Sequence, residues 1–115
     1  VFAMRQGLDL LGQLGVHPEA VLSCGGSNRH PLWLQLQANI YNLPILPAAN
    51  PEATARGAAL LAGLGSGQFA SFADAIRAVP EPTTAILPDP GVVEKYDRAY
   101  QRFKQIYPAL KATQK

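Results

Sequence analysis

The sequence has a single cysteine, Cys24. One cysteine excludes an internal disulfide framework and any metal site built from several cysteines, and it favours a reducing compartment. The sequence also has no apolar run long enough to cross a bilayer and no signal peptide with a basic amino-terminal region. We therefore expect a cytoplasmic protein that does not engage a membrane.

Charge of either sign is sparse. Ten Lys and Arg residues against eight Asp and Glu give a net charge of +2, and no basic block is present. This balance argues against a nucleic-acid partner and suits a neutral or small anionic ligand. At 115 residues and 48% hydrophobic content, the chain is long enough for one domain or a piece of one. Its first residue, Val1, is already in helical register, which favours a piece of a larger domain.

Hydrophobic periodicity predicts that helices and strands alternate. The expected elements are a helix over 1–14, a strand in 20–24, a helix over 31–41, a strand in 43–49, a helix in 50–67, a short helix in 71–79, an extended crossing over 78–90 and a helix over 91–111. Helices of this length between strands allow a parallel sheet with helical cover. The predicted fold class is therefore α/β.

The same periodicity predicts which side chains are buried. The short apolar run at 20–22 is typical of a strand that is buried on both faces. In the helix that begins at Pro31, Leu32, Leu36 and Ile40 share one face. The buried stripe of the last helix is expected to consist of Val92, Tyr96, Tyr100, Phe103 and Tyr107.

The helix in 50–67 has a strong starting signal and a surface of small residues. Asn50 can cap it, Pro51 suits the first helical position, and Glu52 suits the positive end of the helix dipole. Gly57 inside a helix costs about 1 kcal/mol relative to alanine. We expect the close approach of another backbone or of a ligand to compensate for it.

The stretch SCGGSNRHPLW joins the first strand to the next helix. Ligands of parallel sheets gather at the carboxyl ends of the strands. Gly25 and Gly26 would let backbone N–H groups face a ligand, and the start of the helix near Pro31 adds partial positive charge. This arrangement suits a phosphate, although a purely structural turn has the same local pattern.

Four motifs occur in an order that resembles the FGGY family of carbohydrate kinases. They are FAMRQGLDLL, SCGGSNRHPLWLQLQANIYNLPI, PEATARGAALLAGLGSG and ILPDPGVVEKYDRAYQRFKQIYP. The resemblance implies an actin-like (ribonuclease H-like) ATPase fold. In it, residues 1–115 form the carboxyl-terminal portion of the second, ATP-binding domain, and the first domain and the catalytic Asp lie outside this chain.

The resemblance also implies a binding site. Gly25, Gly26 and Ser27 match the glycine-rich turn that lies against the ATP phosphates in the family, and His30 matches a position beside the adenine. For His30, a helix-capping or solvent-facing role is an equal alternative. We interpret Trp33 as a packing residue.

The implied activity is the transfer of the ATP γ-phosphoryl group to a sugar, with Mg²⁺ arriving with ATP. Among family members the motifs are most similar to kinases that convert D-xylulose to D-xylulose 5-phosphate. The alternatives are another ketose or polyol such as ribulose, fuculose or glycerol, and a non-catalytic actin-like nucleotide-binding module. The full-length protein is a candidate homodimer, and the fragment alone is expected to be inactive.

Other residues with reactive side chains are given structural roles. Cys24 ends an apolar strand and has no paired base, so we expect a buried structural thiol. The family's catalytic Asp precedes this segment, and none of the chain's own aspartates matches its motif; these are Asp9, Asp74, Asp89 and Asp97. Asp89 lies between two prolines and is expected to cap the last helix.

Overall fold

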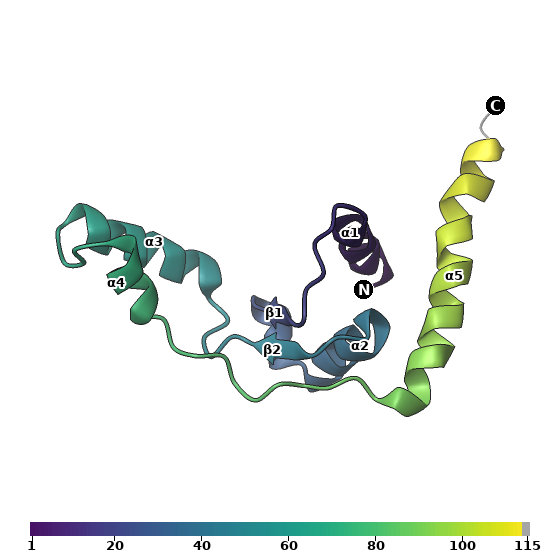
Figure 1. Cartoon of the computed structure of the whole chain (residues 1–115), viewed down its shortest axis with the longest axis horizontal. Helices are drawn as coiled ribbons and strands as arrows, with labels where there is room; N and C mark the ends of the chain where they lie inside the picture. Colours follow the sequence, from purple (N-terminus) through teal and green to yellow (C-terminus); the bar gives the residue numbers. More distant parts are fainter. Residues whose placement is uncertain (114–115) are drawn as a thin grey trace.

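Two short parallel strands lie at the centre of the computed structural model, which describes residues 1–113 (Figure 1). β1 (Val21–Ser23) pairs with β2 (Ile45–Pro47) in a two-stranded sheet, with Val21 opposite Ile45. Ile86, in the extended segment before the last helix, adds an isolated antiparallel bridge to Ile45. The predicted parallel pairing is confirmed.

Helices connect and flank the strands (Figure 1). They are α1 (Phe2–Gln13), the 3-10 helix η1 (Gly26–Arg29), α2 (Pro31–Tyr41), α3 (Ala53–Gly65), α4 (Phe72–Arg77) and α5 (Pro90–Ala112). α2 forms the crossover between β1 and β2, begins with proline at its first turn and ends at Asn42, whose backbone is left-handed. The predicted order of elements is therefore confirmed, and η1 is an addition to it.

The hydrophobic core lies between α2 and β2. Its buried members are Leu34, Ala38, Ile40, Tyr41 and Ile45. The face predicted for α2 is wrong in part, because Leu32 is 73% exposed and Ile40 alone of the three predicted residues is buried. The prediction for β1 is also wrong: Leu22 is 60% exposed, whereas Val21 packs against the core and Ser23 is buried, so only one face of the strand is covered within residues 1–113.

α5 packs through its amino-terminal half (Figure 1). Tyr100 is fully buried, and the Phe2 ring of α1 lies 5.8 Å from the Tyr100 ring and 5.5 Å from the Phe103 ring, measured between centroids. Tyr107, predicted to complete the buried stripe, is exposed because this part of α5 extends past the other elements. The stripe is therefore confirmed at Tyr100 and wrong at Tyr107.

α3 and α4 form a pair that extends away from the strands (Figure 1). α3 begins at Ala53, two residues later than predicted, because the Asn50 side chain accepts a hydrogen bond from the Glu52 N–H (2.9 Å) in a turn before the helix. The close approach expected at Gly57 is not observed, since a β-carbon there would meet nothing within 4 Å. The crowded glycine is Gly63, where an added β-carbon would lie 2.6 Å from the Phe69 ring.

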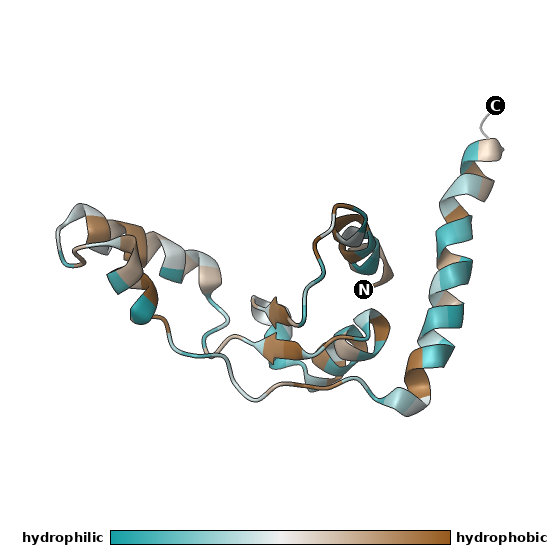
Figure 2. Cartoon of the chain, viewed as in Figure 1, coloured by the Kyte–Doolittle hydropathy of each residue, from teal (hydrophilic) through white to brown (hydrophobic). Residues whose placement is uncertain are grey.

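The chain is extended, and much of its apolar surface is uncovered (Figure 2). It measures 57 × 38 × 27 Å, and its radius of gyration is 18.1 Å, whereas a compact domain of this length has about 13 Å. Large exposed apolar residues occur on each of the helices α1 to α5; they include Leu10, Leu32, Leu61, Phe72, Ile76 and Ile106. None of the helices in residues 1–113 combines the length and apolar character that crossing a bilayer requires.

Candidate functional site

The turn that follows β1 has a backbone that requires glycine at one position. Gly25 has a φ of +93°, a region that residues with a β-carbon rarely adopt. Gly26 has no such constraint, and a β-carbon there would meet nothing within 4 Å. Gly26 therefore faces open space, and its small size leaves room for a ligand to approach the backbone.

Hydrogen bonding divides the backbone N–H groups of the turn into two kinds. The Gly25 N–H donates to the Pro51 carbonyl oxygen at 2.8 Å, so it is already used within the chain. Gly26 and Ser27 occupy the first positions of η1, where N–H groups have no acceptor inside the helix. The two glycines thus differ: the Gly25 N–H is bonded within the chain and its φ is positive, whereas Gly26 lies at the start of η1 beside open space.

A small polar network holds the turn against β1 and α2. Asn28 donates from Nδ2 to the Ser23 carbonyl oxygen (2.5 Å) and accepts from the Ser23 hydroxyl (2.7 Å). Ser23 Oγ also lies 3.2 Å from Oε1 of Gln37, a buried residue of α2. The sequence analysis missed these residues, although an Asn that follows two glycines is a known turn signal.

Two hollows flank the turn. One, of about 300 Å³, lies among α1, β1 and α2; its lining includes Met4, Leu22, Cys24, Ser27 and Trp33. The other, of about 450 Å³, is lined by Ser27, His30, Leu32, Trp33 and Leu36. Cys24 is exposed, so the prediction of a buried thiol is wrong, because the strand ends at Ser23 and the turn carries Cys24 outward.

His30 lies at the position before α2, next to the second hollow. Its side chain makes no hydrogen bond to the start of the helix, so the capping role considered for it is wrong, and it is exposed. Trp33, half-buried, lines both hollows. The structure thus brings Ser27, His30 and Trp33 to one apolar hollow and places Gly25 and Gly26 at the adjacent turn.

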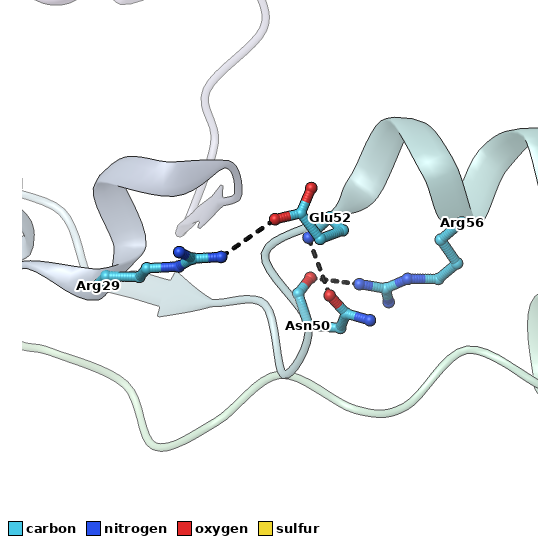
Figure 3. Close-up of polar contacts among 4 residues, drawn as sticks. All are labelled: Arg29, Asn50, Glu52 and Arg56. Atoms are coloured by element: carbon cyan, nitrogen blue, oxygen red, sulfur yellow. Dashed lines mark hydrogen bonds and ion pairs between the residues drawn. The ribbon is translucent and has the colours of Figure 1, made fainter.

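The loop before α3 contacts the turn at the end of η1 (Figure 3). Arg29, the last residue of η1, forms an ion pair with Glu52 (3.2 Å). Arg56 of α3 donates to the carbonyl oxygen of Asn50. With the Gly25–Pro51 hydrogen bond, the loop is joined to both ends of the glycine turn.

The aspartates make structural contacts. Asp89 caps α5 by accepting from the Gly91 N–H (2.9 Å), as predicted. Asp97 pairs with Arg5 at 2.6 Å, and Asp9 accepts a hydrogen bond from Tyr100. Burial, with the Asp9 carboxylate second, raises the pKa of Tyr100 to about 12. No group of three or more His, Cys, Asp or Glu side chains in the part of the chain that the structure describes could hold a metal ion.

The segment that contains the glycine turn matches a known family. The family model for the carboxyl-terminal domain of the FGGY family of carbohydrate kinases matches residues 1–66. The chain belongs to the FGGY family of carbohydrate kinases. The resemblance noted from the sequence motifs is therefore confirmed, and the match includes the glycine turn, α2 and α3.

Two curated members of the FGGY family show how the chain relates to longer proteins. Xylulose kinase of Bacillus subtilis (strain 168) is 32% identical over 106 residues, which are 92% of this chain and 21% of that protein. Autoinducer-2 kinase of Escherichia coli (strain K12) is 32% identical over 92 residues, 80% of this chain and 17% of that protein. The chain spans about a fifth of the length of these relatives.

The FGGY fold is seen directly in a solved relative. The crystal structure of xylulose kinase from Rhodospirillum rubrum superposes with a TM-score of 0.75 at 30% identity, covering 97% of this chain and 23% of that one. This likeness confirms the expected fold class, part of an actin-like α/β domain with short parallel strands covered by helices.

Proposed function

We propose that this chain is the carboxyl-terminal portion of the second domain of an FGGY kinase and supplies part of its ATP site. The observation that supports the site is the open backbone at Gly26, at the carboxyl end of β1 and beside the start of α2. Ligands of α/β sheets bind at such ends, and helix starts favour anions. Membership in a kinase family supports ATP as the phosphoryl donor.

The residues present fit the two ends of ATP. The Gly26 and Ser27 N–H groups suit phosphate oxygens, because they lie at the first positions of η1. The hollow lined by Ser27, His30 and Trp33 is largely apolar, which suits the face of a purine. In this proposal Gly25 shapes the turn, Gly26 and Ser27 contact phosphate, and His30 lies beside the adenine.

Mg²⁺ would enter with ATP and would neutralise charge on its phosphates. The catalytic Asp and most sugar contacts belong, in the proposal, to segments outside this chain. The isolated chain therefore has no phosphotransferase activity of its own. We place the intact protein in the cytoplasm, with sugar and ATP as its partners and a homodimer as its candidate assembly.

The proposed acceptor is a ketopentose, D-xylulose, which becomes D-xylulose 5-phosphate. Support comes from relatives named as xylulose kinases in Bacillus subtilis and Rhodospirillum rubrum, at 32% and 30% identity. A second candidate is a different small hydroxylated acceptor, because the relative named as autoinducer-2 kinase is also 32% identical over 92 residues.

A coupled assay of ADP release by the intact protein tests the proposal. We expect ATP- and Mg²⁺-dependent turnover with D-xylulose that exceeds turnover with ribulose, fuculose, glycerol and autoinducer-2. A preference for one of the other acceptors would change the proposed substrate but leave the proposed kinase activity in place. Absence of turnover with every acceptor, together with retained ATP binding, would favour a non-catalytic nucleotide-binding module.

A further inference from the structure

We infer that Glu52 and Arg29 are positioning residues, which hold the glycine turn in its ATP-binding shape through the loop before α3. The inference rests on the proposed function and extends it to residues that do not line the hollows beside the turn. The loop residues 50–52 meet the turn at two points, one at each end of η1. Figure 3 shows the contact at the end of η1, between Arg29 and Glu52. A turn held at both ends presents its backbone to a ligand in one arrangement.

The first of these two contacts is a backbone hydrogen bond, and the second is an ion pair between side chains. Gly25 donates its N–H to the Pro51 carbonyl oxygen at 2.8 Å, directly before η1. Arg29 Nη2 lies 3.2 Å from Glu52 Oε1, at the end of η1. Between these contacts lie Gly26 and Ser27, whose N–H groups are the candidates for phosphate.

Neighbouring contacts fix the Glu52 side of the ion pair. The Glu52 N–H donates to Oδ1 of Asn50 at 2.9 Å, and Nη2 of Arg56 donates to the Asn50 carbonyl oxygen (Figure 3). Arg56 comes from the second turn of α3, so these contacts connect the loop to the helix. The backbone at Glu52, directly before the first residue of α3, is therefore held by these contacts, and the ion pair joins the Glu52 side chain to η1.

Stability alone does not account for this ion pair. The two side chains are 68% and 63% exposed, and exposed pairs contribute little to folding because water and salt screen them. An exposed pair between η1 and the loop before α3 can still restrict how the two segments move relative to one another. We therefore expect its loss to alter ATP binding more than unfolding.

The test uses Glu52→Gln in the intact protein, because two explanations predict opposite signs. If Glu52 positions the turn through Arg29, its loss raises the KM for ATP about threefold and changes the KM for the sugar by less than about 1.5-fold, within the range of an exposed pair. If Arg29 instead binds phosphate and Glu52 competes with it, Glu52→Gln lowers the KM for ATP. A lowered or unchanged value would overturn the inference.

A charge exchange adds a rescue. Arg29→Glu and Glu52→Arg should each raise the KM for ATP, and the double variant should return to within about twofold of the unchanged protein. Failure of the double variant to recover would assign Arg29 a direct role and overturn the positioning role. The matched control is the exposed pair Glu94–Arg98 of α5, where Glu94→Gln should leave the KM for ATP unchanged.

Hydrogen exchange without nucleotide gives a readout that does not depend on activity. Residues 24–30 should exchange faster in Glu52→Gln and at the normal rate in Glu94→Gln. Unchanged exchange in Glu52→Gln would overturn the inference. If the intact protein phosphorylates no acceptor, the proposed function is contradicted. If it is active but Glu52→Gln leaves its KM for ATP unchanged, only this inference is contradicted.

Discussion

The two regions on either side of the glycine turn are held in different ways. β1, α2 and β2 share one hydrophobic core, in which Ile45 has no exposed surface. In α3 and α4 the buried residues are Gly63 and Ala75, both small, and the large apolar side chain of Leu61 is exposed.

The difference shows how the candidate site depends on the rest of the protein. The core side keeps its shape by burial within this chain, and Asn28 holds the turn to it. The α3 side is joined to the turn by one backbone hydrogen bond and one exposed ion pair. Since the relatives are about five times longer than this chain, we expect other segments of the intact protein to cover the exposed face of α3 and α4.

The largest expected effect is the loss of cooperative folding in the isolated 115-residue chain. A two-stranded sheet with exposed apolar helices leaves too little buried surface for independent stability. Thermal unfolding followed by circular dichroism should be broad or end in aggregation. A sharp transition from a monomer would show instead that the chain is self-sufficient.

Core substitutions in the intact protein compare the two regions directly. Ile45→Ala should lower the free energy of unfolding by about 2–5 kcal/mol, because it leaves a cavity at a fully buried position. Leu61→Ala should cost about 2 kcal/mol if other segments cover α3. Denaturant titration measures both. A cost for Leu61→Ala below about 0.5 kcal/mol would mean that this face stays in solvent.

Gly25→Ala tests the conformational role of the turn. A φ of +93° strains any residue with a β-carbon, so we expect a cost of about 1–3 kcal/mol. The change should lower the melting temperature of the intact protein and weaken ATP binding together. An unchanged melting temperature would show that the turn relaxes without strain.

A substitution at the contact between α1 and α5 should have a smaller effect on stability. Tyr100→Phe removes the hydrogen bond to Asp9 and should lower the free energy of unfolding by about 1 kcal/mol. Tyr107→Phe, at an exposed position of the same helix, is the control and should change nothing. Equal effects of the two substitutions would contradict a specific role for Tyr100.

The same tyrosine predicts a pH dependence. Its pKa is raised from 10.0 to about 12 in the folded protein, so the folded state favours the neutral phenol. Its contribution to stability is complete below pH 10 and is lost as the pH rises towards about 12. Tyr100→Phe should reduce this alkaline loss of stability, as measured by unfolding at several pH values.

Sequence periodicity and local signals predicted most of the fold. The proline at the start of α2, the left-handed Asn42 that ends it and the Asp89 cap of α5 act through nearby backbone, so the sequence suffices to find them. Burial was harder to predict. The exposure of Leu32 and Tyr107 depends on which elements lie opposite them, and spacing along a helix does not carry that information.

For the candidate site, the sequence located the turn but not the contacts that hold it. The glycines marked the turn, but the sequence did not separate Gly25, which has the unusual φ, from Gly26, which faces open space. The contacts of the turn with Pro51 and Glu52 join segments that are more than twenty residues apart in the sequence. Such contacts follow from the path of the chain after β2, which local patterns do not determine.

The most direct test of the proposed ATP-binding role of the turn is the KM for ATP of the intact protein carrying Gly26→Val. A β-carbon at Gly26 meets no atom of the chain within 4 Å, so the substitution obstructs a ligand more than it disturbs the fold. We expect the KM for ATP to rise about tenfold or more, equivalent to about 1.4 kcal/mol, with sugar binding in the absence of nucleotide unchanged. Equal losses of ATP and sugar affinity, with a lowered melting temperature, would contradict the ATP-binding role. The glycines would then form a purely structural turn.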